Sequence, residues 1–347
     1  MKKRTNAVRK LLMAGDIGGT KTRMGIFSLS RGVPVLVKEA AYASREWGSL
    51  EEIIEDSLES SFRIEAACFG VAGPVVNGAA DATNLPWQMK TKRLKQMLVT
   101  EQVLLINDLV ANAYGLQVLK KKDLATLSTG RGGTGNAALL SAGTGLGTAI
   151  LFWNGKQHVP LPSEGGHAEF GPRNRIEVDL LEYLFDRYGH VSYERVLSGA
   201  GLYNIYQFLR DERRFGKEPG WLTEMLLTGD PPAVISETAR LGRNKLCARA
   251  LDLFASLYGA AAGNMALQVM ALSGMYIGGG IAPKIIWKLR DGAFIKAFRN
   301  KGRLSSIVER IPVRVIMNDR AALLGAAVRA AQLLEPADDP GSRAHCE

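Results

Sequence analysis

The stretch LMAGDIGGTKTRMGIF at residues 12–27 decides the fold expected for this chain, together with ALLSAGTGLGTAILF at residues 138–152. In both stretches an apolar run leads into glycines and a threonine, and a second apolar run follows. This pattern predicts two strands joined by a tight turn, whose backbone N–H groups are available to an anion. Two such hairpins predict two related halves that hold one polyphosphate between them, as in an ATP-using enzyme with a cleft.

Composition favours an ordinary globular protein. The chain has 347 residues, of which 46% are hydrophobic and 22% charged, so about two domains are expected. No apolar run reaches the roughly 18 residues that span a bilayer. The most apolar segment, residues 259–271, is interrupted by Asn264 and Gln268 and is predicted to be a buried helix. The basic start is followed by no signal region, and the three cysteines are far apart. We therefore expect a cytoplasmic protein without a membrane partner.

The positive charge of the chain does not require a nucleic-acid partner. The formal net charge is +10, and half of it lies within the first ten residues. The remaining basic clusters, such as residues 90–95 and 120–122, carry no interleaved aromatic residues and no nucleic-acid-binding motif. A solvated basic surface is therefore favoured over a nucleic-acid partner.

Periodicity predicts strands that alternate with helices, which is typical of α/β proteins with largely parallel sheets. Ligands bind at the carboxyl ends of the strands in such sheets. After the two hairpins, the strands are expected at residues 34–41, 66–71, 103–106, 275–277 and 313–317. The helices are expected at residues 50–61, 178–188, 201–210, 231–241, 245–271 and 321–334.

The apolar run at residues 103–106 leads directly into Asn107 and Asp108, and a helical stretch follows. Asp108 could cap that helix by accepting backbone N–H groups. It could also serve as a general base, with Asn107 holding the substrate. The surrounding glycine turns favour the catalytic role, and one residue can fill both roles.

The segment LPSEGGHAEFG at residues 161–171 places two carboxylates and a histidine around a Gly-Gly turn. Zinc uses such ligands, but the chain has four histidines and no second cluster to complete a closed site. Carboxylates and an imidazole on a rigid turn suit a polyol, although a plain surface loop remains an alternative. Glu194 is a further candidate for the same role.

Three other glycine motifs bear on nucleotide binding. A Gly-x-x-x-x-Gly-Lys-Ser/Thr P-loop is absent from the sequence. Residues 130–135 match Gly-x-Gly-x-x-Gly, but a strand follows instead of the helix that dinucleotide binding requires. A flexible surface loop is the favoured interpretation. Residues 278–280 form a packing turn, or a turn that receives the ribose or α-phosphate of a nucleotide.

Four of these segments, in this order, resemble the bacterial glucokinases. They are Gly15–Thr20 with Arg23, Ile106–Asp108, Ser163–Glu169 and Ile277–Gly280. The resemblance spans residues 12–335 and implies an α/β, actin-like (ribonuclease H-like) two-domain fold, with two mixed sheets flanked by helices and a central cleft. It implies a small domain of residues 1–110 plus 320–335, a large domain of residues 111–319, and a disordered tail at 336–347. The Cys-x-Cys-Gly zinc motif of the related repressor–kinase family is absent, which indicates the zinc-free group.

The resemblance also implies the reaction: glucose is phosphorylated at its 6-hydroxyl by Mg-ATP, with Asp108 as the catalytic base. The residues implied to hold the other sugar hydroxyls are Asn107, Glu164, His167 and Glu194. Those implied to bind ATP are Gly15, Asp16, Ile17, Gly18, Gly19, Thr20, Gly143, Thr144, Gly145 and Gly279. No direct metal ligand is implied, and Asp16 is expected to orient Mg²⁺ through water. A homodimer is expected from the family. The basic N-terminal extension has no assigned role.

Three alternatives stay open at this point. The same loops would serve a kinase for another hexose or an amino sugar, and the donor could be ATP or polyphosphate. A sugar-responsive regulator without catalysis would keep the fold, although Asp108 and the short segment before the first strand argue against it. An actin-like ATPase that moves or assembles is disfavoured by the Glu-Gly-Gly-His turn.

Overall fold

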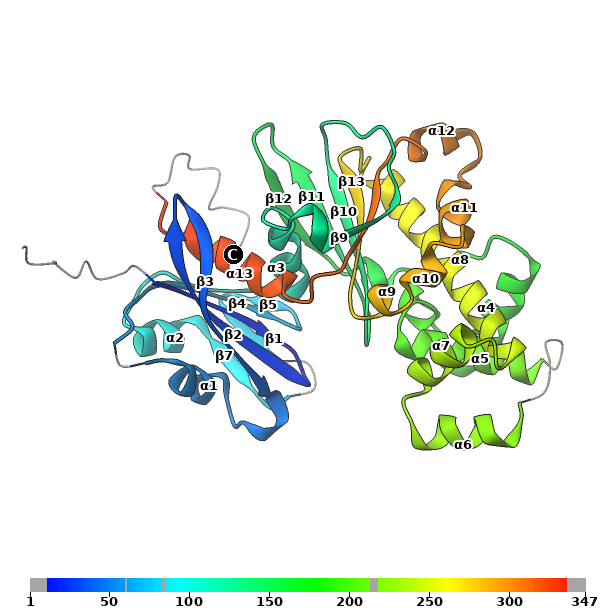
Figure 1. Cartoon of the computed structure of the whole chain (residues 1–347), viewed down its shortest axis with the longest axis horizontal. Coiled ribbons are helices and arrows are strands. Elements are labelled where there is room, and N and C mark those ends of the chain that lie inside the picture. Colours follow the sequence, from blue (N-terminus) through cyan, green and yellow to red (C-terminus); the bar gives the residue numbers. More distant parts are fainter. Residues whose placement is uncertain (1–10, 60, 83–84, 213–217, 336–347) are drawn as a thin grey trace, which may run out of the picture. The chain divides into compact units, whose positions relative to one another are not determined.

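The computed structural model describes residues 11–59, 61–82, 85–212 and 218–335 (Figure 1). The chain divides into two compact units: unit 1 comprises Met1–Lys120 and Asn318–Glu347, and unit 2 comprises Lys121–Met317. The basic N-terminal extension and the tail expected at residues 336–347 lie outside the described residues. Within the described part, no helix is both long and apolar enough to cross a membrane.

Unit 1 is built on a mixed sheet with the strand order β3-β2-β1-β4-β8. The hairpin of β1 and β2 is antiparallel, whereas β4 pairs parallel with both β1 and β8. The strands are β1 (Leu11–Ile17), β2 (Lys21–Ser30), β3 (Val33–Ala43), β4 (Ile64–Val71) and β8 (Val103–Asn107). A small antiparallel sheet, which the periodicity did not predict, contains β5 (Val75–Val76), β6 (Ala79–Asp81) and β7 (Gln88–Lys90).

Both faces of this sheet are covered, which explains why its strands are almost continuously apolar. Along β1, Leu11 and Met13 pack into one hydrophobic cluster with residues of α1 and α2, whereas Leu12 and Ala14 pack into a second cluster with residues of α3 and α13. Alternate side chains of a strand point to opposite faces. The helices are α1 (Leu50–Ser57), α2 (Thr91–Leu98), α3 (Asp108–Gly115) and α13 (Ala321–Gln332). Helix α1 ends earlier than predicted, because Leu58 adopts an extended conformation.

Helix α13 brings the end of the described chain back to unit 1, where it packs on α3. The two helices approach closely, because a Cβ atom at Gly325 would lie 1.7 Å from the carbonyl oxygen of Ala111. Helix α3 therefore belongs to unit 1. The sequence-based limit at residue 110 had assigned most of α3 to the larger domain. The structural units divide at Lys120 instead, because the contacts that hold α3 come from α13, a helix distant in the sequence, which no local pattern reveals.

Unit 2 contains a second mixed sheet, with the order β12-β11-β10-β13-β14-β9. Its β10–β11 hairpin is antiparallel, and β13 pairs parallel with both β10 and β14. The strands are β9 (Leu124–Ser128), β10 (Ala137–Ala142), β11 (Leu146–Trp153), β12 (His158–Ser163), β13 (Gly274–Gly278) and β14 (Val313–Ile316). Apart from β9, this order repeats that of unit 1, which confirms the two related halves predicted from the paired hairpins and the two mixed sheets implied by the family resemblance.

Helices make up most of the remainder of unit 2. Helix α8 is central to its core, because residues along most of its length are buried; this confirms the buried helix predicted over residues 259–271, except that the helix ends at Gln268. The helices are α4 (Arg175–Tyr188), α5 (Gly199–Asp211), α6 (Gly220–Thr228), α7 (Pro231–Arg240), α8 (Lys245–Gln268), α9 (Ile281–Lys284), α10 (Ile286–Leu289), α11 (Ala293–Arg299) and α12 (Ser305–Val308).

The Gly-x-Gly-x-x-Gly match at residues 130–135 is a loop that leads into β10, as its context predicted. Its backbone is fastened: the N–H groups of Arg131 and Gly132 both donate to the carbonyl oxygen of Arg310, at 3.0 and 2.9 Å. The loop therefore has a packing role next to the segment that precedes β14.

Replacing Gly325 by alanine tests the α3–α13 contact. The added methyl group would overlap the Ala111 carbonyl, so the helices must separate. We expect the free energy of unfolding to fall by about 1–3 kcal/mol. Urea denaturation measures it. Gly220→Ala is the control, because a Cβ atom there would meet nothing within 4 Å. Equal stability of the two variants would contradict this packing.

Candidate active site

In unit 1, the turn between β1 and β2 is held by Ser44, which lies in a short 3₁₀ turn after β3. The Ser44 hydroxyl donates to the carbonyl oxygen of Gly18 at 2.7 Å, and its backbone N–H donates to that of Thr20 at 3.1 Å. The N–H of Gly18 closes the turn on the Lys21 carbonyl at 3.1 Å. The predicted phosphate turn is thus a rigid element. Ser44 was missed by the sequence analysis, because its role depends on the pairing of β3 with β2.

The side chain of Asp16 lies in a charged cluster at this end of the sheet. Asp16 on β1 is the cross-strand neighbour of Arg23 on β2. Arg23 forms an ion pair with Asp319 and lies 3.9 Å from a Glu39 oxygen, and Arg320 binds the other Glu39 oxygen at 3.0 Å. Burial raises the pKa of Asp16 to about 6, with Arg23 opposing this shift and Asp319 adding to it.

Asp319 was not among the predicted residues. Its hydrogen bond to Arg23 raises the pKa of the guanidinium, and the same contact lowers the pKa of the Asp319 carboxyl. A sequence signal does exist for it. An Asn-Asp pair lies at or near the start of a helix both at residues 318–319 and at Asn107 and Asp108. Local patterns do not connect the two Asn-Asp pairs, because the second pair follows a strand of unit 2.

At the end of β8, Asn107 rather than Asp108 caps helix α3. The Asn107 side-chain oxygen accepts the N–H groups of Leu109 and Val110, at 2.9 and 3.4 Å, and its amide nitrogen donates to the Gly73 carbonyl at 3.1 Å. Asp108 is the first helical residue, and its Oδ1 accepts the Leu109 N–H at 2.9 Å. The hypothesis that Asp108 is the cap was therefore wrong. The cap fixes the backbone that carries the Asp108 carboxylate.

In unit 2, three glycine-containing segments meet at the ends of β10 and β13. The Gly143 N–H closes the β10–β11 turn on the Gly145 carbonyl at 2.9 Å, and the Gly143 carbonyl accepts the Gly199 N–H, at the start of α5, at 2.9 Å. Gly279 follows β13 with a φ of +81°, and a Cβ atom there would lie 2.1 Å from the Ala142 carbonyl oxygen. The structure therefore brings Gly143, Thr144, Gly145 and Gly279 together.

Tyr258 on α8 connects the ends of β10 and β13. Its buried hydroxyl accepts the Ala142 N–H at 3.2 Å and lies 3.3 Å from the Gly278 carbonyl oxygen, to which it donates. Burial raises the pKa of the Tyr258 hydroxyl, so it remains a donor at neutral pH. Tyr258 is a second residue that local patterns could not reveal.

The Glu-Gly-Gly-His segment forms a 3₁₀ turn, Gly165–His167, that presents Glu164 and His167 to solvent. Gly166 packs directly on β11, since a Cβ atom there would lie 1.9 Å from the Leu146 carbonyl oxygen. Glu194 reaches the same residue from another turn, and its Oε2 accepts the Leu146 N–H at 3.0 Å. Leu146 thus joins the predicted sugar-binding residues of unit 2 to the glycine turn that it follows.

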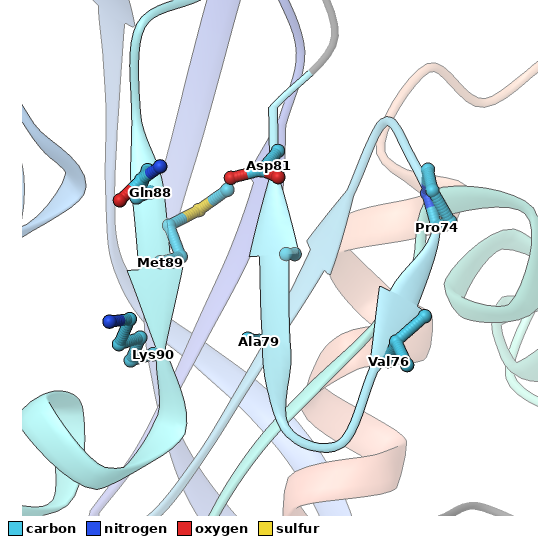
Figure 2. A pocket seen from close by; sticks show the side chains of 8 residues that line it. Pro74, Val76, Ala79, Asp81, Gln88, Met89 and Lys90 are labelled. Atoms are coloured by element: carbon cyan, nitrogen blue, oxygen red, sulfur yellow. The ribbon is translucent and has the colours of Figure 1, made fainter.

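A separate hollow of about 370 Å³ lies over the small sheet β5–β7 (Figure 2). Val76, Ala79 and Met89 contribute apolar lining, with Asp81, Gln88 and Lys90 at its polar side. None of the predicted site residues lines it. We therefore assign the candidate site to the strand ends described above.

Metal binding is constrained by the donors present. Among the residues that the structure describes, no three His, Cys, Asp or Glu side chains gather as a metal site. Mg²⁺ typically takes one or two carboxylates and completes its shell with phosphate oxygens and water. The buried carboxylate of Asp16, beside the β1–β2 turn, fits such a site.

Replacing Asp16 by asparagine tests the cost of its burial. Because its pKa rises from 3.8 unfolded to about 6 folded, the folded protein binds this proton more tightly. The charged carboxylate therefore destabilises the fold above pH 6, and the effect fades toward pH 4. Asp16→Asn should be more stable than wild type by about 1–3 kcal/mol at pH 8 and nearly equal at pH 4, measured by urea denaturation.

Asp319→Asn is the matched control. The pKa of Asp319 is lowered by Arg23, so its stabilising effect is present above its unfolded pKa and is lost in acid. That variant should be less stable than wild type at pH 8. A stability difference for Asp16→Asn that is the same at both pH values would contradict the assignment.

Known proteins that are similar in sequence and in structure include glucokinases. A family model described as glucokinase matches residues 13–333. The glucokinase of Trichormus variabilis is 42% identical over 341 residues, covering 93% of this chain and 99% of its own. The crystal structure of a glucokinase from an Antarctic psychrotroph matches at a TM-score of 0.82 and 29% identity, over 93% of this chain and 99% of that chain. A ROK family glucokinase from Streptomyces griseus, crystallised with glucose and AMPPNP, shares the fold at a TM-score of 0.62 and 22% identity, over 93% and 99% of the two chains. These matches confirm the resemblance and the actin-like sugar kinase fold: the chain belongs to the glucokinase family.

Proposed function

We propose that this protein transfers the γ-phosphoryl group of ATP to the 6-hydroxyl of glucose, giving glucose 6-phosphate and ADP. The observation that carries the proposal is the end of β8, where Asn107 caps α3 and Asp108 begins it. Family membership supports the same reaction, as do the glucose and the ATP analogue bound by the related Streptomyces griseus enzyme. A cytoplasmic homodimer is proposed with it.

The glycine turns are proposed to bind the nucleotide. Residues 15–20 would contact the phosphates through backbone N–H groups, and Gly143–Gly145 and Gly279 would contact the rest of the nucleotide. Positioning and charge neutralisation dominate phosphoryl transfer. Mg²⁺, oriented by Asp16, supplies charge neutralisation on the phosphate oxygens when bound. Lys21, exposed directly after the first turn, adds positive charge at the same place.

Asp108 is proposed as the general base. It accepts the proton of the sugar 6-hydroxyl as that oxygen bonds to the γ-phosphorus and the bond from phosphorus to the ADP oxygen breaks. Asn107, Glu164, His167 and Glu194 would pair with the other hydroxyls. A sugar that leaves one of these groups unpaired is rejected, because desolvated polar groups without partners cost on the order of 1–3 kcal/mol each.

The decisive experiment measures ADP release from Mg-ATP with glucose, mannose, fructose, galactose, N-acetylglucosamine or no sugar. We expect strong stimulation by glucose alone. Stimulation by another sugar would keep the mechanism and change the substrate. No stimulation by any sugar would overturn the kinase function and favour a sugar-responsive binding protein.

Asp108→Asn tests the base within this assay. The asparagine oxygen can still accept the Leu109 N–H, so folding and glucose binding should persist while kcat falls by roughly 10²–10⁴. Asn107→Ala is the comparison variant: loss of the cap should lower stability by about 1 kcal/mol. An Asp108→Asn enzyme with wild-type kcat would contradict the assignment.

A further inference from the structure

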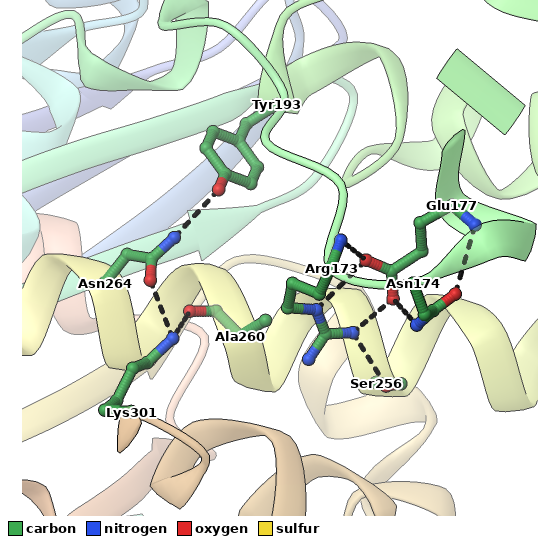
Figure 3. Close-up of polar contacts among 8 residues, drawn as sticks. All are labelled: Arg173, Asn174, Glu177, Tyr193, Ser256, Ala260, Asn264 and Lys301. Atoms are coloured by element: carbon green, nitrogen blue, oxygen red, sulfur yellow. Dashed lines mark hydrogen bonds and ion pairs between the residues drawn. The ribbon is translucent and has the colours of Figure 1, made fainter. Parts of the chain in front are cut away.

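A chain of polar contacts in unit 2 runs from Lys301 to the residue beside Glu194 (Figure 3). The Lys301 ammonium donates to the Asn264 side-chain oxygen at 2.6 Å and to the Ala260 carbonyl at 2.9 Å. The Asn264 amide nitrogen donates to the Tyr193 hydroxyl at 2.8 Å. Asn264 is one of the two polar residues that interrupt the most apolar stretch of the sequence, and this network gives its side chain partners for both the oxygen and the nitrogen.

The direction of these hydrogen bonds is fixed by Lys301. An ammonium group can only donate, so the Asn264 oxygen must face Lys301 and its amide nitrogen must face Tyr193. Gly263 makes room for the lysine, because a Cβ atom there would lie 2.5 Å from the Lys301 Cε atom. Replacing the ammonium by an apolar group would remove the reason for this amide orientation.

Tyr193 holds the proposed sugar-binding turns by two contacts and by its own position in the chain. Its N–H donates to the Ala168 carbonyl at 2.9 Å, directly after His167. Its ring packs edge-on against Phe170, with centroids 5.9 Å apart. It also begins the 3₁₀ turn, Tyr193–Arg195, that carries Glu194. A shift of Tyr193 would therefore move His167 and Glu194 together.

Helix α8 also holds the far side of the same loop. Arg173 donates to the Ser256 hydroxyl at 3.0 Å and is itself held by the fully buried Glu177, whose Oε2 accepts the Arg173 Nε at 3.0 Å. Ser256, Ala260 and Asn264 follow one another at four-residue intervals along one face of α8 (Figure 3). The segment that follows His167 is thus fastened to α8 at two places, through Tyr193 and through Arg173.

Lys301 occupies an unfavourable place for a charge. Burial, together with the nearby Arg173, lowers its pKa to about 8. An apolar side chain of the same length would fill this space without that desolvation cost. A lysine here is therefore better explained by what it orients than by its contribution to stability.

We propose that Lys301 is a positioning residue for the sugar: through Asn264 and Tyr193 it fixes the Glu164–His167 turn and Glu194 in register with each other. This role rests on the proposed function, since it concerns the residues assigned there to the sugar hydroxyls. Lys301 acts mainly on sugar affinity, because its own side-chain contacts lie on α8 and reach the glycine turn only through Tyr193, Glu194 and the Leu146 N–H.

The test is a double-mutant cycle of Lys301→Met and Tyr193→Phe, read by steady-state kinetics and by the rise in Tm on adding glucose. Each single variant should raise KM for glucose, Lys301→Met by about tenfold, the factor that corresponds to one charge-assisted hydrogen bond. KM for ATP should stay within about twofold of wild type. The double variant should be no worse than the poorer single variant, because both break one chain of contacts.

Lys296→Met, an exposed lysine on the neighbouring α11, is the matched control and should behave as wild type. Variants with a lower Tm but a wild-type KM for glucose would overturn the positioning role, as would equal increases in KM for glucose and ATP. If Lys301→Met does not fold, Tyr193→Phe alone decides between these outcomes. Wild-type protein without sugar-stimulated ADP release would overturn the proposed function as well, which separates that failure from this one.

Discussion

Parallel strands of one sheet must end at the same edge, and the candidate site of each unit depends on this constraint. In unit 1, the parallel pairing of β4 with β1 and β8 places the β1–β2 turn, Gly73 and the Asn107–Asp108 step at one edge. In unit 2, the parallel pairing of β10 with β13 does the same for Gly143–Gly145 and Gly279. The repeated strand order therefore produces two versions of one device, an edge of glycine turns with polar residues at strand ends.

The polar side chains at the two sheet edges differ in how the fold holds them. Unit 1 buries the Asp16 carboxylate beside Arg23, and the raised pKa of Asp16 shows that the fold does not fully compensate for this charge. Such a destabilised group is typical of a functional site. Unit 2 instead holds the Glu194 carboxylate, which accepts the Leu146 N–H, and Tyr193 and Arg173 tie the neighbouring segments to α8. Flexible parts of the substrate are thus expected to contact protein side chains of unit 2 whose positions are already fixed by hydrogen bonds within the unit.

Local patterns were sufficient for much of the fold. Both hairpins, β4, β8, β13 and the long helix α8 followed from periodicity and glycine placement, and the family resemblance followed from four motifs in order. The short strands β5–β7 were missed, because a strand of two or three residues has no period to detect. Asp108 was considered as an alternative cap of α3, whereas the structure has Asn107 at that position; both residue types cap helices and only geometry separates them. Asp319, Ser44 and Lys301 depend on contacts between segments distant in sequence. The roles assigned to individual site residues remain predictions.

The central claim is that the glycine turns bind the nucleotide and that residues 107–108, 164–167 and 194 bind the sugar. Hydrogen–deuterium exchange of the whole protein tests it most directly, with glucose alone and with glucose plus Mg²⁺ and AMPPNP. Glucose alone should slow exchange at residues 107–112, 164–171 and 191–197. The nucleotide should add protection at residues 15–22, 143–147 and 278–282. Protection confined to other segments, such as residues 74–81 and 88–90 around the hollow of unit 1, would contradict this account.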